Sequence, residues 1–399
     1  MNLNFLFKEI TLFKKYKTNV TIIGWYLLAF LTALSEVLRG AKAVNNYQIF
    51  KQVFLHTRQQ IDLYIPYPAE YFDLNHYGII FSILIAPFAL LPDWLGCLLW
   101  CMANAAFLAY VVNRLPVSDK NKLIVLAIGL IELLTAIHNV QFNPMVTAFI
   151  IFPFILVKEE KEWLATFFIA AGFLMKLYGI VALVTFLFSK NKMKFFGWLI
   201  FWLLILFCLP MLISSPSFVV QSYTDWYHSL NEKNNLNTSL GIVVGQNISV
   251  HGMLQRIFNL PGLSQLWVLV PAAIFNLLPL LRLRAYKSTC FQLYYLALCL
   301  ISVTIFSSSA ESSTYIIAVI GVALWFVLGD MKNKIAIALL VLTFIFTILS
   351  PTDLYPNYIQ KHFFVQYALK ALPCFLVWIG IVVKLLTHNF TQTIAPAHA

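Results

Sequence analysis

The densest group of residues that could do chemistry lies at residues 62–77, DLYIPYPAEYFDLNHY. It contains three carboxylates, Asp62, Glu70 and Asp73, and it ends with His76 and Tyr77. A carboxylate can take a proton from a hydroxyl group, and tyrosine rings beside it suit a sugar, whose C–H faces stack. Prolines and aromatics at this density indicate an ordered loop at a membrane interface. The alternative interpretation is an aromatic belt with solvated acids.

Two further polar groups lie where apolar runs end. The stretch 138–144, HNVQFNP, offers the amides of Gln141 and Asn143, and the stretch 176–179, KLYG, offers Lys176 and Tyr178. An amide can hydrogen-bond a sugar or a phosphate. A lysine can bind a phosphate as a point charge; the alternative is that it only extends its ammonium group to the membrane surface.

The second half of the chain has two comparable stretches, 247–256, NISVHGMLQR, and 307–315, SSSAESSTY. Arg256 could clamp a phosphate through two parallel hydrogen bonds, and Asn247 could bind the same ligand. Glu311 lies in a polar patch that is either a small loop or the wall of a cavity. The sequence has no HExxH, GxSxG, P-loop or GxGxxG pattern. We therefore predict no metal site and no cofactor, and leave a divalent cation open.

The elements that position these residues must be membrane-spanning helices. The chain has 399 residues, of which 61% are apolar and 11% charged, and its mean hydropathy is +0.81. Soluble domains contain about 45–50% apolar and about 25% charged residues. The composition excludes a water-soluble enzyme, a nucleic-acid-binding module and a disordered tail. It predicts an all-α polytopic membrane protein.

Apolar runs predict about twelve transmembrane helices, several of them shorter than the ~20 residues of a straight span. The first is interpreted as a retained signal anchor. A further run at 77–92 is apolar but contains Pro87 and Pro92. The predicted spans are 18–38, 94–113, 123–140, 143–157, 163–176, 177–189, 195–213, 264–281, 289–306, 315–329, 335–350 and 368–387.

The basic residues decide whether 77–92 crosses the membrane. If it does not cross and the N-terminus is cytoplasmic, only nine of the 27 basic residues lie outside and the other 18 lie inside. If it crosses, 18 basic residues lie outside and only nine lie inside. Because basic residues favour cytoplasmic loops, the count predicts that 77–92 is an outer juxtamembrane helix. The nine outer residues are Arg39, Lys42, Lys51, Arg58, Lys176, Lys233, Arg256, Lys361 and Lys370.

The predicted topology is a single integral membrane domain over 1–399 with both termini inside. Its outer loops are about 39–93, 214–263 and 351–367. The inner loops are too short for a nucleotide-binding domain. Any chemistry must therefore take place at the outer face or within the membrane, and its energy must come from an activated lipid or an ion gradient.

Three stretches together resemble glycosyltransferase family 87: residues 64–92, the turn QFNP at 141–144, and AGFLMKLY at 171–178. The stretches 247–256 and 307–315 also resemble outer segments of this family. The resemblance implies a GT-C-type fold with juxtamembrane helices in the first outer loop. It also implies a polyprenyl-phosphate-dependent mannosyl- or arabinofuranosyltransferase of the bacterial inner (plasma) membrane, with its active site on the extracytoplasmic side.

The sequence departs from the family pattern at one position. In the family, the first outer loop begins with an aspartate a few residues before a tyrosine, and that aspartate is thought to be the catalytic base. The matching stretch here, 45–50, reads NNYQIF and has Asn46 near the aspartate position. An amide cannot accept a proton at neutral pH. The predicted substitutes are Asp73, Glu70 and Asp62, in that order.

The leading hypothesis is a membrane glycosyltransferase that moves a mannose-like or other hexose or pentose from a polyprenyl-phosphate donor to an envelope lipid or glycan, by inverting displacement. No nucleic-acid partner is expected. The alternative is a transporter or flippase for a lipid-linked or anionic solute, with Glu132 and Glu311 as transport residues; a noncatalytic scaffold is a third. The predicted substrate-binding residues are Asn46, His76, Tyr77, Gln141, Asn143, Lys176, Tyr178, Asn247, Arg256 and Glu311.

Overall fold

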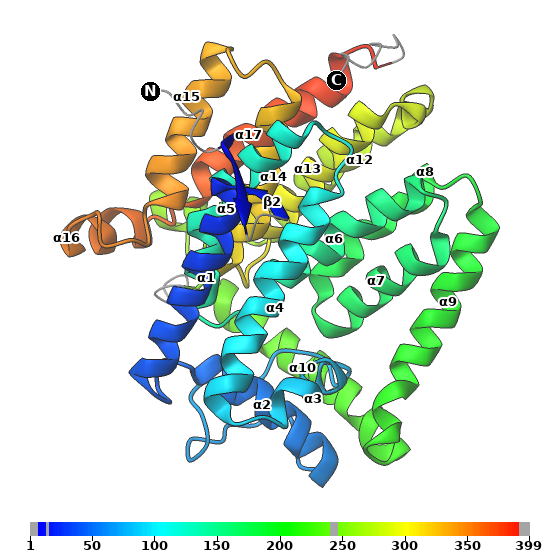
Figure 1. The fold of residues 1–399 in the computed structure, drawn as a ribbon, viewed down its shortest axis with the longest axis vertical. Coiled ribbons are helices and arrows are strands. Elements are labelled where there is room, and N and C mark those ends of the chain that lie inside the picture. The colour runs from blue at the N-terminus through cyan, green and yellow to red at the C-terminus, as the bar shows by residue number, and fades with distance from the viewer. Residues whose placement is uncertain (1–6, 13–15, 240–245, 391–399) are drawn as a thin grey trace. The chain divides into compact units, whose positions relative to one another are not determined.

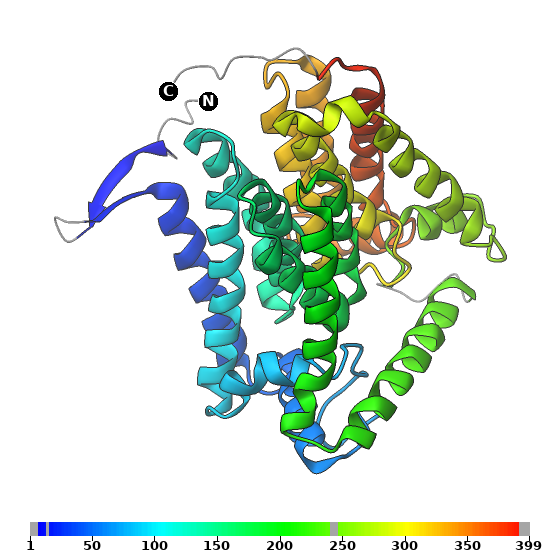
Figure 2. The same ribbon diagram turned by 90° about the vertical axis from the view of Figure 1, so that its right-hand side faces the viewer.

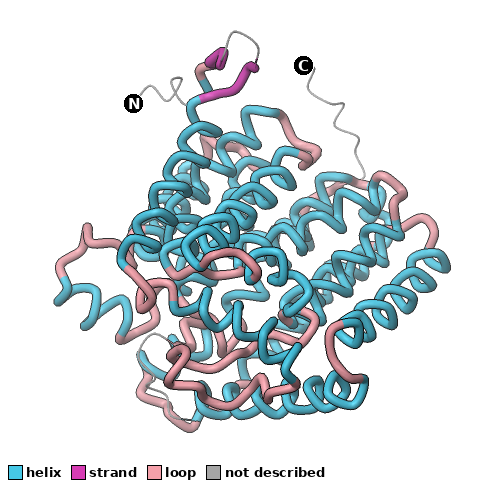
Figure 3. Tube along the Cα trace, turned by 60° about the horizontal axis from the view of Figure 1, so that its bottom comes forward, coloured by secondary structure: helices cyan, strands magenta, loops and turns pink. Residues whose placement is uncertain are grey.

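The computed structural model describes residues 7–12, 16–239 and 246–390, and it is 75% helical. In those residues the only strands are β1 (Glu9–Leu12) and β2 (Tyr16–Asn19), which pair antiparallel with Glu9 opposite Asn19 (Figure 3). The predicted all-α class is therefore correct except for this hairpin. β-Branched residues such as Ile10 and Thr18 favour strands in this polar lead-in to the first apolar run.

The chain forms two compact units, Met1–Leu236 and Asn237–Ala399. The first unit contains α1 (Val20–Arg39), α2 (Asn45–Gln59), α3 (Phe81–Ala89), α4 (Asp93–Asn113), α5 (Asp119–His138), α6 (Asn143–Lys158), α7 (Glu162–Met175), α8 (Thr185–Phe188), α9 (Lys192–Cys208) and most of α10 (Pro216–Ser239). The second contains α11 (Val250–Ile257), α12 (Leu266–Leu277), α13 (Thr289–Ile305), α14 (Tyr315–Leu328), α15 (Lys334–Leu342), α16 (Asn357–Ile359) and α17 (Ala371–Thr387).

The apolar helices coincide with the predicted runs. Four have the length and composition of a membrane span: α1, α4, α5 and the stretch Lys192–Leu212. Eight others in the described residues are apolar but have at most 17 residues. At ~1.5 Å per residue such helices are shorter than the ~30 Å hydrocarbon core. The chain is therefore an integral membrane protein, whereas the number of twelve crossings stays a prediction.

The run at 77–92 forms a helix that is too short to span the hydrocarbon core. α3 has nine residues, which is about 14 Å of helix. The Tyr47 hydroxyl of α2 donates to the Phe88 carbonyl at 2.9 Å, and Lys51 pairs with Asp93 at 2.6 Å. α2 and α3 thus lie across one end of α1 and α4 (Figures 1 and 2), and we call this the α2–α3 end of the first unit.

The loops that follow α4 and α6 lie at the opposite end of the first unit. The Lys120 ammonium is 5.4 Å from the ring centroid of Phe7, which precedes the hairpin. Arg114 pairs with Glu159, and the loop 188–192 is tied to the same end by Lys190 and Glu160 at 2.6 Å. We call this the basic end. After α4 the chain therefore returns to the end of the unit that holds Phe7 and the hairpin.

Two glycines allow the close approaches that position the α2–α3 end. A Cβ on Gly78 would lie 2.0 Å from the Leu174 carbonyl oxygen of α7, and Gly78 N donates to the Met175 carbonyl at 3.1 Å. A Cβ on Gly179 would lie 2.4 Å from the backbone of Gly172. Gly78 is therefore held against the end of α7, and the segment after α7 packs on the same helix at Gly172. α6 lies inside the unit, because every residue from Asn143 to Val157 is buried.

Candidate active site

The turn between α5 and α6 carries several polar side chains in a strained conformation. Val140 has φ +48° and is buried. A β-branched residue rarely adopts this conformation, which costs about 1–3 kcal/mol and is found mainly at functional sites. Gln141 N donates to the Ala136 carbonyl at 2.9 Å and so closes the turn. The turn presents His138, Gln141 and Asn143 at the α2–α3 end.

The ammonium group of Lys176 contacts this turn directly. Its ammonium donates to Asn143 Oδ1 at 2.7 Å and lies 5.5 Å from the ring centroid of Tyr77 and 5.1 Å from that of Tyr178. Tyr77 also donates its hydroxyl to Gln141 Oε1 at 3.4 Å. Five of the predicted substrate-binding residues therefore form one cluster, which we call the Lys176 cluster. A half-buried ammonium held between two rings favours a bound anion.

An aromatic cluster fixes the ring of Tyr77. Tyr77 stacks on Phe81 with a centroid distance of 4.7 Å and meets Phe142 edge-on at 5.9 Å. Phe50 and Trp100 complete this cluster and are fully or almost fully buried. Because its neighbours are packed, the Tyr77 ring keeps its place beside Lys176 without a ligand.

His76 lies beside the cluster but keeps its ring uncharged. Burial, together with the charges of Lys233 and Lys176, lowers the pKa of His76 to about 3. Its Nδ1 is buried and has no hydrogen-bond partner in the described residues. Its carbonyl accepts from Trp226 Nε1 of α10 at 2.9 Å. The imidazole is therefore neutral at pH 7 beside two lysine charges.

The three predicted catalytic carboxylates lie in the same loop but make separate contacts. Asp73 is exposed, has φ +74°, and accepts from Leu74 N at 2.8 Å. Glu70 pairs with the buried imidazole of His56 at 2.9 Å. Asp62 accepts from Tyr64 N at 2.8 Å and so shapes its own turn. These three partners all lie outside the Lys176 cluster.

Asn46 reaches the α5–α6 turn from α2. Its side-chain amide donates to the Asn139 carbonyl at 2.7 Å. The neighbouring Asn45 exchanges two hydrogen bonds with the backbone of Phe72, at 2.8 and 2.7 Å, and so holds the 62–77 loop against α2. The beginning of α2, the loop and the turn are therefore one assembly.

Sequence reasoning left out the most unusual pair at this end. Glu36, in the last turn of α1, is 3% exposed, and its Oε1 lies 2.7 Å from His138 Nδ1. Its Oε2 accepts from Arg39 at 2.7 Å. Neither Glu36 nor His138 was among the predicted site residues. A carboxylate in the last turn of an apolar span is the signal that could have found it, because burying a charge there is costly.

In the second unit, the predicted residues have internal partners. Asn247 donates to the Asn237 carbonyl at 3.0 Å and accepts from Ser249 at 2.6 Å. Arg256 donates to the carbonyls of Gln246 and Val365 at 2.8 and 3.2 Å. Glu311 accepts from Gln246 Nε2 at 2.9 Å. These contacts join the 247–256 and 307–315 stretches, and they also explain Asn247 and Arg256 as structural residues.

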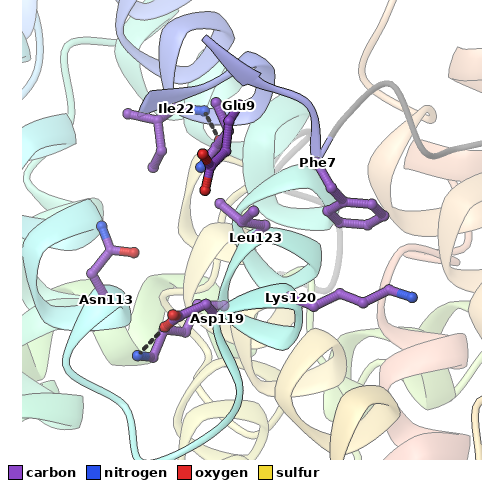
Figure 4. A pocket seen from close by; sticks show the side chains of 9 residues that line it. Phe7, Glu9, Ile22, Asn113, Asp119, Lys120 and Leu123 are labelled. Atoms are coloured by element: carbon purple, nitrogen blue, oxygen red, sulfur yellow. Dashed lines mark hydrogen bonds and ion pairs between the residues drawn. The ribbon is translucent and has the colours of Figure 1, made fainter. Parts of the chain in front are cut away.

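A pocket of about 570 Å³ lies at the basic end rather than at the candidate site. Its lining comes from the N-terminal segment, the beginning of α1, the end of α4 and the beginning of α5, with Glu9, Asn113 and Lys120 among the labelled residues of Figure 4. None of the predicted site residues lines it. The pocket therefore gives no support to the site predicted from sequence.

Comparison with known proteins agrees with the resemblance seen in the sequence. A search of the curated proteins found no match. The sequence model of glycosyltransferase family 87 matches residues 75–351, which include the α5–α6 turn, Lys176 and both polar stretches of the second unit. The match covers more than half of the chain, so this integral membrane protein belongs to glycosyltransferase family 87.

Proposed function

We propose that this chain transfers a sugar from a polyprenyl-phosphate donor to a hydroxyl group of an envelope lipid or glycan. The reaction takes place at the extracytoplasmic face of the bacterial plasma membrane and inverts the anomeric carbon. Membership of family 87 supports the reaction class. A mannose-like sugar is the default donor sugar because of that membership alone, and another hexose or a pentose is compatible with the same residues.

The observation that carries the proposal is the environment of Lys176. Its ammonium is held by Asn143 and lies between the rings of Tyr77 and Tyr178. A phosphate that leaves with a lipid gains negative charge as the sugar departs. A fixed positive charge stabilises that developing charge without rearrangement. We assign Lys176 this role, with the neutral His76 beside it.

The remaining predicted residues are proposed to bind the sugar and its acceptor. Gln141, Asn143 and Asn46 offer amides at the α5–α6 turn, and Tyr77 and Tyr178 offer ring faces. Asn247, Arg256 and Glu311 of the second unit are proposed as further substrate-binding residues. The carboxylates Asp73, Glu70 and Asp62 are the sequence-based candidates for the base.

The chemical step is a single displacement. The acceptor hydroxyl loses its proton to a base, and its oxygen attacks the anomeric carbon from the face opposite the phosphate. The bond from the anomeric carbon to the phosphate oxygen breaks, and its electron pair leaves with the polyprenyl phosphate. One positioned base contributes about 10²–10⁴-fold to the rate of such a step.

The first prediction concerns Lys176→Gln, which removes the charge and keeps most of the side-chain length. We expect kcat/KM for the donor to fall on the order of 10²–10³-fold, as for the loss of one preorganised electrostatic contact. The measurement is transfer of radiolabel from a panel of polyprenyl-phosphate sugars to host lipid extract by the purified protein in vesicles.

The matched control is Lys194→Gln, which removes an exposed lysine at the basic end. It should transfer label at the wild-type rate. Equal activity of Lys176→Gln and Lys194→Gln would contradict the assignment of Lys176. A folded wild-type protein that transfers label from no donor would contradict the proposed function, and flux of the labelled lipid across the vesicle would favour the transporter.

A further inference from the structure

The buried carboxylate at the end of α1 is paired with a histidine that faces outward. Glu36 is 3% exposed, whereas the side chain of His138 is 54% exposed. Glu36 uses one oxygen for Arg39 and the other for His138 Nδ1, each at 2.7 Å. The carboxylate is therefore fully engaged, and its own oxygens are poorly placed to receive a substrate proton.

The pairing fixes which nitrogen of His138 can act as a base. A carboxylate that accepts from Nδ1–H keeps the proton on that nitrogen and leaves the lone pair on Nε2. In the described residues, Nε2 of His138 has no hydrogen-bond partner, and the ring is half exposed. A histidine oriented by a buried carboxylate, with its other nitrogen open, is the arrangement of a general base.

The position of His138 agrees with such a role. It is the last residue of α5, and the strained turn that follows it carries Gln141 and Asn143, the second of which holds Lys176. Asn46 donates to Asn139 of the same turn but is an amide, which cannot accept a proton. The loop carboxylates Asp73 and Glu70 have partners elsewhere. His138 is thus the open basic group that shares a turn with the phosphate-binding residues.

We propose that His138 is the catalytic base of this chain and that Glu36 is its positioning residue. This assignment rests on the proposed function. The acceptor hydroxyl gives its proton to His138 Nε2, and the oxygen forms the new bond to the anomeric carbon. The bond to the phosphate oxygen breaks, and its electron pair leaves with the polyprenyl phosphate. The imidazolium that results is stabilised by the Glu36 carboxylate and returns its proton to water.

Two neighbouring helices place charged or titratable groups near Glu36. Arg39 of α1 contacts the carboxylate directly. The thiol of Cys101 in α4 lies close enough to Glu36 for a charge interaction. A general base acts only in its unprotonated form, so kcat/KM is expected to fall on the acidic side of its pH profile.

The test measures kcat/KM against pH for vesicle-bound wild-type protein and for His138→Gln, Glu36→Gln and His138→Ala. We expect His138→Gln to lose about 10²–10⁴-fold in kcat/KM and to lose the acidic limb. Glu36→Gln should lower kcat/KM and retain the acidic limb, because the base is still present but its ring is no longer held by the carboxylate. Added imidazole should restore part of the activity of His138→Ala, which a structural role would not allow.

The matched control is His228→Gln, which replaces an exposed histidine of α10 and should leave the profile unchanged. Wild-type activity in His138→Gln overturns the assignment while the proposed function stands. A His138→Ala variant that added imidazole does not rescue also overturns the assignment. Loss of the acidic limb of the pH profile in only one of the variants Asp73→Asn, Glu70→Gln or Asp62→Asn does so as well. A wild-type protein without transfer from any donor overturns both.

Discussion

At the residue scale, the candidate site depends on charges that the fold holds next to uncharged partners. Lys176 is placed by an amide and two rings, whereas His76 is kept neutral by burial and by the lysines near it. Val140 takes up a strained backbone conformation in the turn between His138 and Asn143. The strained backbone of Val140 and the buried, unpartnered Nδ1 of His76 each cost stability at the place where the chemistry is proposed.

His76 predicts how stability depends on pH. Its pKa is about 3 in the folded protein, against an ordinary value near 6.5. Below pH 6.5 the unfolded chain therefore binds a proton that the folded chain does not. Folding stability should fall as pH falls from about 6.5 toward 3, by up to ~1.4 kcal/mol per pH unit for this group.

This prediction is checked by thermal unfolding in detergent at pH 7.5 and pH 5. His76→Gln should reduce the loss of stability at the lower pH, because glutamine does not titrate. His228→Gln, at an exposed position, should behave as the wild type does. An unchanged pH dependence in His76→Gln would mean that another group causes the effect.

At the element scale, the site is assembled by short elements rather than by the long spans alone. α2 and α3 lie across the ends of α1 and α4 (Figure 2), and the 62–77 loop is fastened to α2 by Asn45. The loop is also packed on α10 through an apolar cluster of Leu63, Tyr64, Ile79, Val219 and Trp226. The backbone contact between Gly78 and α7 then fixes Tyr77 beside Lys176.

Gly78→Ala tests this contact. The new Cβ would lie 2.0 Å from the Leu174 carbonyl oxygen, so the backbone must shift. We expect the free energy of unfolding to fall by about 1–3 kcal/mol, as for other overpacked positions, and transfer activity to fall with it because Tyr77 is displaced. Thermal unfolding in detergent and the vesicle assay measure the two effects.

Gly24→Ala is the matched control, because a Cβ at that position of α1 meets nothing within 4 Å. Alanine also favours a helix over glycine by roughly 1 kcal/mol, so this variant should be at least as stable as the wild type. If Gly78→Ala were equally stable, the contact with α7 would not fix the loop.

At the scale of the whole molecule, the folding of residues 77–92 sets the direction of every helix that follows in the first unit. α3 is too short to span the membrane, and Asp119 and Phe72 lie at opposite ends of that unit. In a Cys208→Ala, Cys290→Ala background, Asp119→Cys and Phe72→Cys should be labelled from opposite faces of a sealed vesicle. If 77–92 crossed the membrane, an impermeant thiol reagent would label both from the same face.

The sequence by itself determined the class of the protein and the places of its helices. Composition excluded a soluble fold, and hydropathy located the apolar helices to within a few residues, because burial in lipid dictates residue type over long runs. The asymmetry of basic residues predicted that 77–92 does not cross. The N-terminal hairpin, α10 and α11 were not predicted, because they are short or polar and carry no hydropathy signal.

Only the tertiary structure decided which polar residues meet. Hydropathy and motif order indicated Lys176, Asn143, Gln141 and Tyr77 one by one. The contacts among them depend on close backbone approaches at Gly78 and Gly179, and such approaches produce no periodic pattern in the sequence. The pairing of Glu36 with His138 joins residues about a hundred positions apart on two helices. Such a pair is set by how α1 and α5 pack side by side, which residue spacing along one chain cannot reveal.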